Sequence, residues 1–184
     1  MLTSRLKNIQ QVLKIFTGDG EPHNDREKYI LNSMWVMLFS EFEGSIKDLA
    51  ENYINFVIKK KSVKDMHVCF LLQNFYGNKK DKDEFTKAEI MGLFKREKSK
   101  ISISNFTRNK KPTYKSFTVE HLFNSLGVFL KEQEKTNLKL LDGIASTRDS
   151  ISHGDYHVSI TRKELEESIK TVKKIYKMLK TKLK

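Results

Sequence analysis

The sequence of 184 residues has only one cysteine, Cys69, and therefore cannot form a disulfide within the chain. A zinc site built from several thiolates is excluded for the same reason. Because Cys69 lies in the apolar segment Val68–Leu72, we expect it to be a core residue and not a nucleophile. A chain without a disulfide is typical of a reducing compartment, so we expect a cytoplasmic protein.

Long apolar runs are also missing. No uncharged segment is long enough to cross a bilayer, and the first residues, Met1–Lys7, lack the apolar stretch of a signal peptide. We therefore expect neither a secretion signal nor a membrane partner.

Proline and glycine are scarce, with two and eight residues, and between them apolar residues recur three and four positions apart. This is the period of an α-helix, so the sequence predicts an all-α fold.

Positive charge, in contrast, is abundant. The chain has 35 Lys and Arg against 23 Asp and Glu, a formal net charge of +12. Such an excess attracts phosphates, nucleic acids or anionic lipids, and it does not select among them. Residues 161–184 are especially basic, and they form either a solvated helix face or a surface that binds nucleic acid. Membrane-surface binding is disfavoured because Leu165 and Ile169 of this helix are needed to pack the fold.

The helical period predicts seven helices, which cover residues 4–16, 25–60, 62–75, 86–96, 118–132, 137–152 and 162–183. The second is the longest and is apolar almost all the way round over residues 34–42, so we expect it to be the central helix. Asp25 is its expected N-cap. Residues 98–116 lose the helical pattern and are expected to form an ordered loop. The length suits one domain over residues 1–184, with 77–116 as an insert.

The chemistry of the chain is expected at the end of the sixth helix, between Arg148 and His153. Gly154 suits the left-handed turn that ends a helix, which places His153 at the helix C-terminus. There the helix dipole and the carboxylate of Asp149, one turn earlier, favour a protonated imidazole. His153 is therefore a candidate for proton transfer near neutral pH.

Arg148 lies five positions before His153, and on an ideal helix their side chains point about 140° apart. Either a distorted last turn or a second subunit is needed to bring them together. Two copies related by a two-fold axis would line one cleft with Arg148 and His153 of both chains. Such a cleft suits a phosphodiester, because arginine stabilises negative charge and histidine moves protons.

The pattern Arg-(x)4-His, preceded by Leu140–Ile144 and followed by Gly154, resembles the signature of the HEPN superfamily. These are small helical proteins of prokaryotic toxin–antitoxin and phage-defence systems. Residues 37–50, where Glu43 and Gly44 follow an aromatic residue, are similar to the long second helix of that family. The resemblance covers residues 25–60 and 122–184. It implies an all-α, HEPN-like helical bundle with a long central helix and an inserted helix-plus-loop segment.

The resemblance also implies an endoribonuclease that works as a homodimer on RNA, without a metal and without a cofactor. Attack by the 2′-OH of the RNA on the neighbouring phosphate would leave a cyclic phosphate and a 5′-OH end. His153 would be the acid or base, and Arg148 would stabilise the phosphorane. Such a protein is a toxic effector, paired with an antitoxin or another defence-system protein. The alternative is a catalytically inactive subunit of the same fold that binds RNA or acts as an adaptor.

Four further residues are expected to support the site. Glu43 and Lys47, at i and i+4, form either an ordinary surface pair or part of the cleft. Asp149 stands where relatives often have Asn, and it either repels a phosphate or orients His153. Tyr156 lies one position later than the tyrosine that is modified in the branch paired with nucleotidyltransferase antitoxins. RNA is expected to bind through the loop 108–115 and the last helix, by Arg108, Lys110, Lys111, Lys173 and Lys177.

Overall fold

The computed structural model of the chain describes residues 2–16, 18, 20–59 and 113–183. The helices predicted over 62–75 and 86–96, most of the expected insert, and Cys69, Arg108, Lys110 and Lys111 lie outside the described residues. The described part is all-helical and contains no strand, which confirms the predicted fold class. The division of the chain into one domain and an insert stays a prediction.

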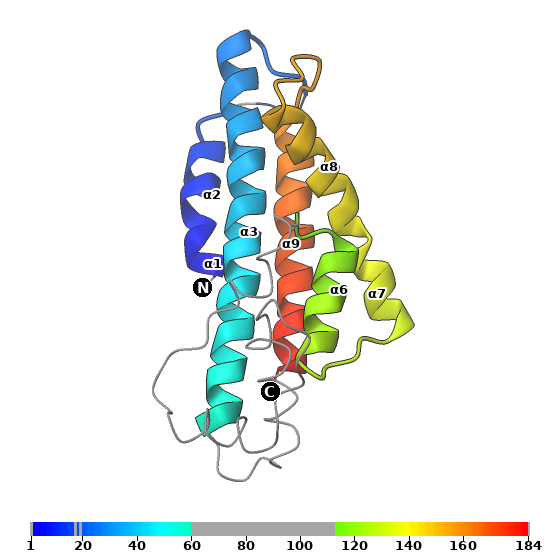
Figure 1. Cartoon of the computed structure of the whole chain (residues 1–184). Helices are drawn as coiled ribbons and strands as arrows, with labels where there is room; N and C mark the ends of the chain where they lie inside the picture. Colours follow the sequence, from blue (N-terminus) through cyan, green and yellow to red (C-terminus); the bar gives the residue numbers. More distant parts are fainter. Residues whose placement is uncertain (1, 17, 19, 60–112, 184) are drawn as a thin grey trace.

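The helix α3 (Asp25–Lys59) runs the length of the described fold (Figure 1). The short helices α1 (Leu2–Arg5) and α2 (Lys7–Leu13) cover one side of it. On the other side it packs mainly against α9 (Arg162–Lys182) and α8 (Leu140–Ser152). The remaining helices, α6 (Ser116–Ser125) and α7 (Glu132–Leu138), complete the bundle beside α8 and α9.

The apolar middle of α3 forms the centre of the core, as its sequence predicts. Leu38, Phe39 and Phe42 are fully buried. The indole Nε1 of Trp35 donates a hydrogen bond of 3.0 Å to the carbonyl of Ile144 in α8. This bond satisfies the polar atom of a buried aromatic residue and fixes α8 against α3. The position of α8 matters because this helix carries the Arg-(x)4-His motif.

The boundaries of four helices differ from the prediction. The predicted helix 4–16 is instead two short helices, α1 and α2, divided at Leu6. The N-cap of α3 is Asn24, whose side-chain oxygen accepts the N–H of Glu27 at 3.0 Å, so Asp25 is the first residue of the helix. The predicted helix 118–132 is wrong beyond Ser125, because the chain turns at Gly127 with φ +75°. The predicted helix 137–152 is divided at Lys139 into α7 and α8.

Candidate active site

The end of α8 has the geometry that the sequence predicts. Gly154 adopts φ +82°, and its N–H donates to the carbonyl of Ile151 at 3.1 Å. The N–H of Asp155 donates to the carbonyl of Ser150 at 3.0 Å, which completes the double hydrogen bond of a helix-ending Schellman turn. His153 is the C-cap residue and is exposed. Its side chain has no hydrogen-bond or ion-pair partner within the described part of the chain, so the imidazole is free to meet a ligand.

The side chain of Arg148 points in another direction, toward α3. Its Nη2 lies 3.6 Å from Oε2 of Glu43, and its Nη1 donates to Oδ1 of Asp149 at 2.9 Å. The guanidinium carbon lies 5.6 Å from the centre of the Phe39 ring. The side chain is 24% exposed, and its buried Nε has no hydrogen-bond partner. Three contacts therefore hold Arg148 in place and leave part of its guanidinium open to solvent.

Both carboxylate oxygens of Asp149 contact cationic side chains, and neither contacts His153. Oδ1 accepts the hydrogen bond from Arg148, and Oδ2 lies 3.5 Å from the ammonium of Lys115. These contacts do not include His153, and the role of repelling a phosphate stays a prediction. The carboxylate instead compensates the charge of Arg148 and links it to Lys115.

Glu43 and Lys47 do not form an ion pair with each other in the described structure. Oε1 of Glu43 accepts the backbone N–H of Tyr114 at 3.1 Å, while Oε2 faces Arg148. The ammonium of Lys47 lies 5.1 Å from the centre of the Tyr114 ring, within the range of a cation–π contact. Glu43 thus reaches the candidate site through Arg148, and Lys47 packs on the residue that Glu43 holds.

Tyr114 and Lys115 belong to this cluster, although the sequence predicts them only as part of the RNA-binding loop 108–115 and not as residues of the active site. Tyr114 is buried, and its hydroxyl has no hydrogen-bond partner in the described structure. Burial, and next the carboxylates of Glu43 and Glu51, raise the pKa of the phenol. Lys115 immediately precedes α6, whose first residue, Ser116, donates its N–H and its hydroxyl to Asp142 of α8, each at 2.7 Å.

The side chains of Glu43, Arg148, Asp149 and Lys115 thus alternate in charge and carry no net charge together. A phosphate that approaches Arg148 competes with two carboxylates for the guanidinium. Arg148 faces α3 while His153 lies at the exposed end of α8, in keeping with the angle expected from helix geometry. No hydrogen bond or ion pair joins these two side chains within the described residues.

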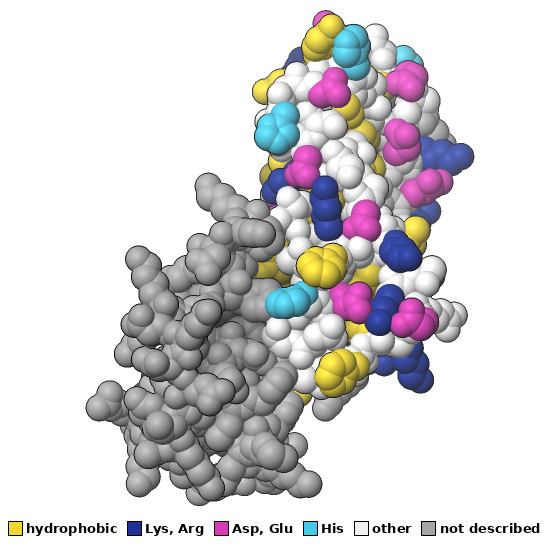
Figure 2. All heavy atoms as spheres, turned by 45° about the vertical axis from the view of Figure 1, so that its right-hand side comes forward, with side chains coloured by type: hydrophobic (Ala, Val, Ile, Leu, Met, Phe, Trp, Pro, Cys, Tyr) yellow, Lys and Arg dark blue, Asp and Glu magenta, His cyan; other side chains and the backbone are white. Residues whose placement is uncertain are grey.

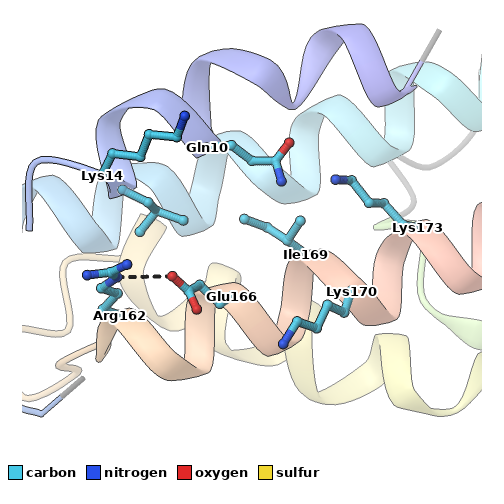
Figure 3. A pocket seen from close by; sticks show the side chains of 8 residues that line it. Gln10, Lys14, Arg162, Glu166, Ile169, Lys170 and Lys173 are labelled. Carbon is cyan, nitrogen blue, oxygen red and sulfur yellow. Dashed lines mark hydrogen bonds and ion pairs between the residues drawn. The ribbon is translucent and has the colours of Figure 1, made fainter. Parts of the chain in front are cut away.

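The remaining predicted site residues lie on other surfaces. Tyr156 is 75% exposed, and its ring centre lies 3.9 Å from that of His157. Lys177 is exposed on α9, and Lys173 lines a groove of about 350 Å³ between α2 and α9. Figure 3 shows further cations on this groove, which are Lys14, Arg162 and Lys170, with Glu166 paired to Arg162 at 3.0 Å. The role of α9 in RNA binding stays a prediction.

The face on the side of α6, α7 and α8 carries charges of both signs. Figure 2 shows acidic and basic side chains interspersed there, with single hydrophobic side chains and histidines between them. In the part of the chain that is described, no three His, Cys, Asp or Glu side chains are grouped so that they could hold a metal ion. None of the described helices is long and apolar enough to span a membrane.

The model of the RiboL-PSP-HEPN family matches residues 1–184, including the segment that the resemblance in the sequence left unmatched. No curated protein and no solved structure was found to match the chain. The family match agrees with the all-helical fold and supports a ribonuclease or RNA-binding role. The chain therefore belongs to the RiboL-PSP-HEPN family, within the HEPN superfamily that its motif resembles.

Proposed function

We propose that this protein is a metal-independent endoribonuclease whose catalytic residues are Arg148 and His153. One observation carries the proposal: a single helix presents an arginine held by Glu43, Asp149 and Phe39 and, five residues later, an exposed and unpaired histidine. A positioned arginine suits the stabilisation of phosphate charge, and a free imidazole suits proton transfer. The family membership supports a role on RNA. The presence of both a held arginine and a free histidine at one helix end favours RNA cleavage over RNA binding alone.

The reaction that fits these groups uses the RNA as its own nucleophile. One imidazole accepts the proton of the 2′-OH while the 2′-oxygen forms a bond to the neighbouring phosphorus. The bond from phosphorus to the 5′-oxygen breaks, and a second imidazole, in its protonated form, donates a proton to that oxygen. Arg148 stabilises the additional negative charge on the phosphorane. The products are a 2′,3′-cyclic phosphate and a 5′-OH end, and DNA is not cleaved because it lacks the nucleophile.

This scheme needs two imidazoles, and it needs Arg148 near at least one of them. In one chain, Arg148 is turned toward α3 and His153 lies at the exposed end of α8. A second copy, related by a two-fold axis and packed against the end of α8, would supply the missing histidine. We therefore propose a homodimer with the site at the subunit interface.

The biological role that we propose is that of a toxic effector in a prokaryotic defence or toxin–antitoxin system. This proposal rests on the superfamily that the Arg148–His153 motif resembles, and it includes a cytoplasmic location and a partner protein that restrains the toxicity. Expression in a bacterial host should arrest growth, and His153→Ala should relieve the arrest. Equal growth of the two strains at equal protein levels would contradict the toxic role.

One observation favours a second candidate, an RNA-binding or adaptor subunit without turnover. Both Glu43 and Asp149 compensate the charge of Arg148, which is the arrangement expected of a structural arginine. Such a protein would bind RNA through the basic groove beside α9 and leave the RNA intact.

Cleavage of single-stranded RNA in EDTA separates the two candidates. We expect the parent protein to yield cyclic-phosphate ends and to leave DNA of the same sequence uncut. His153→Ala should remove the activity, while His121→Ala, at an exposed histidine on α6 outside the motif, should retain it. Binding of RNA without any cleavage by the parent protein would reject the nuclease and select the adaptor.

A further inference from the structure

A cavity of about 330 Å³ adjoins the candidate active site. It lies between the first turns of α3 and the turn that ends α8, and it is lined by Asp25, Lys28, Tyr29, Asn32, Asp155 and Tyr156, together with residues of the α8 end. Among those residues are Ile151 and Gly154, which flank the stretch that contains His153. A ligand in this cavity would therefore lie next to the proposed catalytic histidine.

Two aromatic rings border the cavity and face solvent. Tyr29 is 77% exposed and Tyr156 is 75% exposed, so neither ring contributes to the hydrophobic core. Exposed rings beside a cavity are the groups on which unpaired RNA bases stack. The exposed phenylalanines of the described chain are Phe56 on α3, Phe117 on α6 and Phe129 on the connection to α7, and they do not line this cavity.

The frame of the cavity is tied together by bonds between distant parts of the chain. The ammonium of Lys28 donates to the carbonyl of Tyr156, and the side-chain amide of Asn32 donates to the carbonyl of Val158 at 2.9 Å. Both bonds anchor the segment after α8 on α3. The cavity is therefore formed before a ligand arrives, which lowers the entropic cost of binding.

The polar groups that line the cavity include two carboxylates, those of Asp25 and Asp155. Oδ1 of Asp155 already accepts the N–H of His157 at 3.0 Å, which leaves Asp25 as the less engaged acceptor. Lys28 already donates to a backbone carbonyl. Acceptors pair with N–H donors, and guanine presents an N1–H and an amino group side by side on its Watson–Crick edge. Uracil presents a single N–H there, so we expect it to be the weaker ligand.

We propose that this cavity binds an unpaired base of the RNA beside the phosphate that is cut, with a preference for guanine. Tyr29 and Tyr156 supply the stacking surface, and Asp25 accepts hydrogen bonds from the edge of the base. This inference rests on the proposed function for its place beside a scissile phosphate. It assigns base selection to residues outside the Arg-(x)4-His motif.

The test measures binding of the full chain to fully 2′-O-methylated single-stranded RNAs that differ at one position, which holds G, A, C or U. These RNAs have no free 2′-OH and cannot be cleaved. We expect the parent protein to bind the G-containing RNA most tightly. Tyr29→Ala and Tyr156→Ala should each weaken that binding roughly 5- to 100-fold and abolish the preference. Tyr156→Phe should retain it because the ring remains. Phe129→Ala, an equally exposed ring away from the cavity, is the matched control and should bind as the parent does.

Failure of this inference and failure of the nuclease proposal give different results. Base preference that disappears in the tyrosine variants supports the inference even if no RNA is cleaved. Cleavage of RNA with the same base preference in the parent, Tyr29→Ala and Tyr156→Ala would overturn it. Binding of free guanosine monophosphate without any preference in RNA would also overturn it. So would a change of oligomeric state in the tyrosine variants by light scattering, because the rings would then be subunit contacts.

Discussion

Glu43 of α3 and Arg148 of α8 form an ion pair across the interface of the two helices, with 3.6 Å between Oε2 and Nη2. The other carboxylate oxygen accepts the N–H of Tyr114 at 3.1 Å. The side chain of Glu43 is only 15% exposed. One carboxylate therefore connects the central helix, the motif helix and the segment that leads into α6.

Replacing Glu43 with glutamine keeps the shape of the side chain and removes its charge. We expect Glu43→Gln to lower the free energy of unfolding by about 1–2 kcal/mol, because the partly buried Arg148 loses one of its two anionic partners. Urea denaturation measures this difference. Glu167→Gln on the exposed face of α9 is the control and should change stability by less than about 0.5 kcal/mol. Equal effects of the two substitutions would contradict the role of the ion pair.

Tyr114 should make stability depend on alkaline pH. Its pKa is 10.0 in the unfolded chain, and burial and the nearby Glu43 and Glu51 raise it in the folded protein. Above pH 10 the unfolded chain releases a proton that the folded protein keeps, so the free energy of unfolding falls as pH rises. The slope from this group is at most about 1.4 kcal/mol per pH unit, and it is absent below pH 10.

Tyr114→Phe isolates this effect. Denaturant unfolding between pH 8 and pH 11.5 should show a smaller alkaline loss in the variant than in the parent. Tyr53, whose pKa is also raised by burial, is present in both proteins and cancels in the comparison. At pH 7 the variant should be as stable as the parent within about 1 kcal/mol, because the removed hydroxyl has no hydrogen-bond partner in the described structure. A loss of several kcal/mol at pH 7 would reveal a bond to that hydroxyl.

Gly143 within α8 and Gly154 in the turn that ends it should respond to alanine with opposite signs. A Cβ at either Gly143 or Gly154 would meet nothing within 4 Å, so only the backbone decides. Gly154 has φ +82°, and Gly154→Ala should cost about 1–2 kcal/mol. Gly143 lies within the helix, and Gly143→Ala should stabilise by about 0.5–1 kcal/mol. Thermal unfolding measures both changes. If the two variants shift the unfolding temperature in the same direction, the positive φ at Gly154 does not penalise alanine in this turn.

Local patterns were sufficient to predict most of the fold. The period of apolar residues predicts α3 and α9 nearly to their ends, and Gly154 predicts the end of α8. The break at Gly127 was missed because the apolar period continues across it, and only the left-handed backbone of that residue ends α6.

The candidate site was predictable only in part. Arg148 and His153 stand in a short local pattern, so the sequence alone selects them. The contacts of Tyr114 and Lys115 with residues 71 and 34 positions away along the chain depend on how the segment that leads into α6 lies against α3 and α8. The spacing of apolar residues along the chain does not predict these long-range contacts. The spacing of Asp149 from His153 predicts an interaction between these two residues. In the structure, the carboxylate of Asp149 contacts Arg148 and Lys115 instead.

Asp149→Asn tests whether this carboxylate limits access to Arg148. We expect tighter RNA binding and a steeper dependence of the binding constant on salt, because Arg148 and Lys115 lose a competing anion. Fluorescence anisotropy with an uncleavable RNA over 50–300 mM salt measures both. Glu132→Gln, an exposed acid of α7 that pairs with Lys135, removes the same charge away from the site and serves as the control. Identical salt dependence in the two variants would mean that Asp149 does not shield the site.

Mixed dimers provide the strongest test of a shared active site. The proposed cleft needs the imidazoles of both chains, so one His153→Ala chain should inactivate the dimer that contains it. Co-expression of His153→Ala with the parent at equal levels leaves about a quarter of the dimers with two parent chains, so the preparation should retain about a quarter of the parent activity. If each chain instead acts alone, the preparation should retain about half. Light scattering must show dimers in all samples, and a monomeric parent protein with full activity would refute the interface and the proposed sharing of residues together.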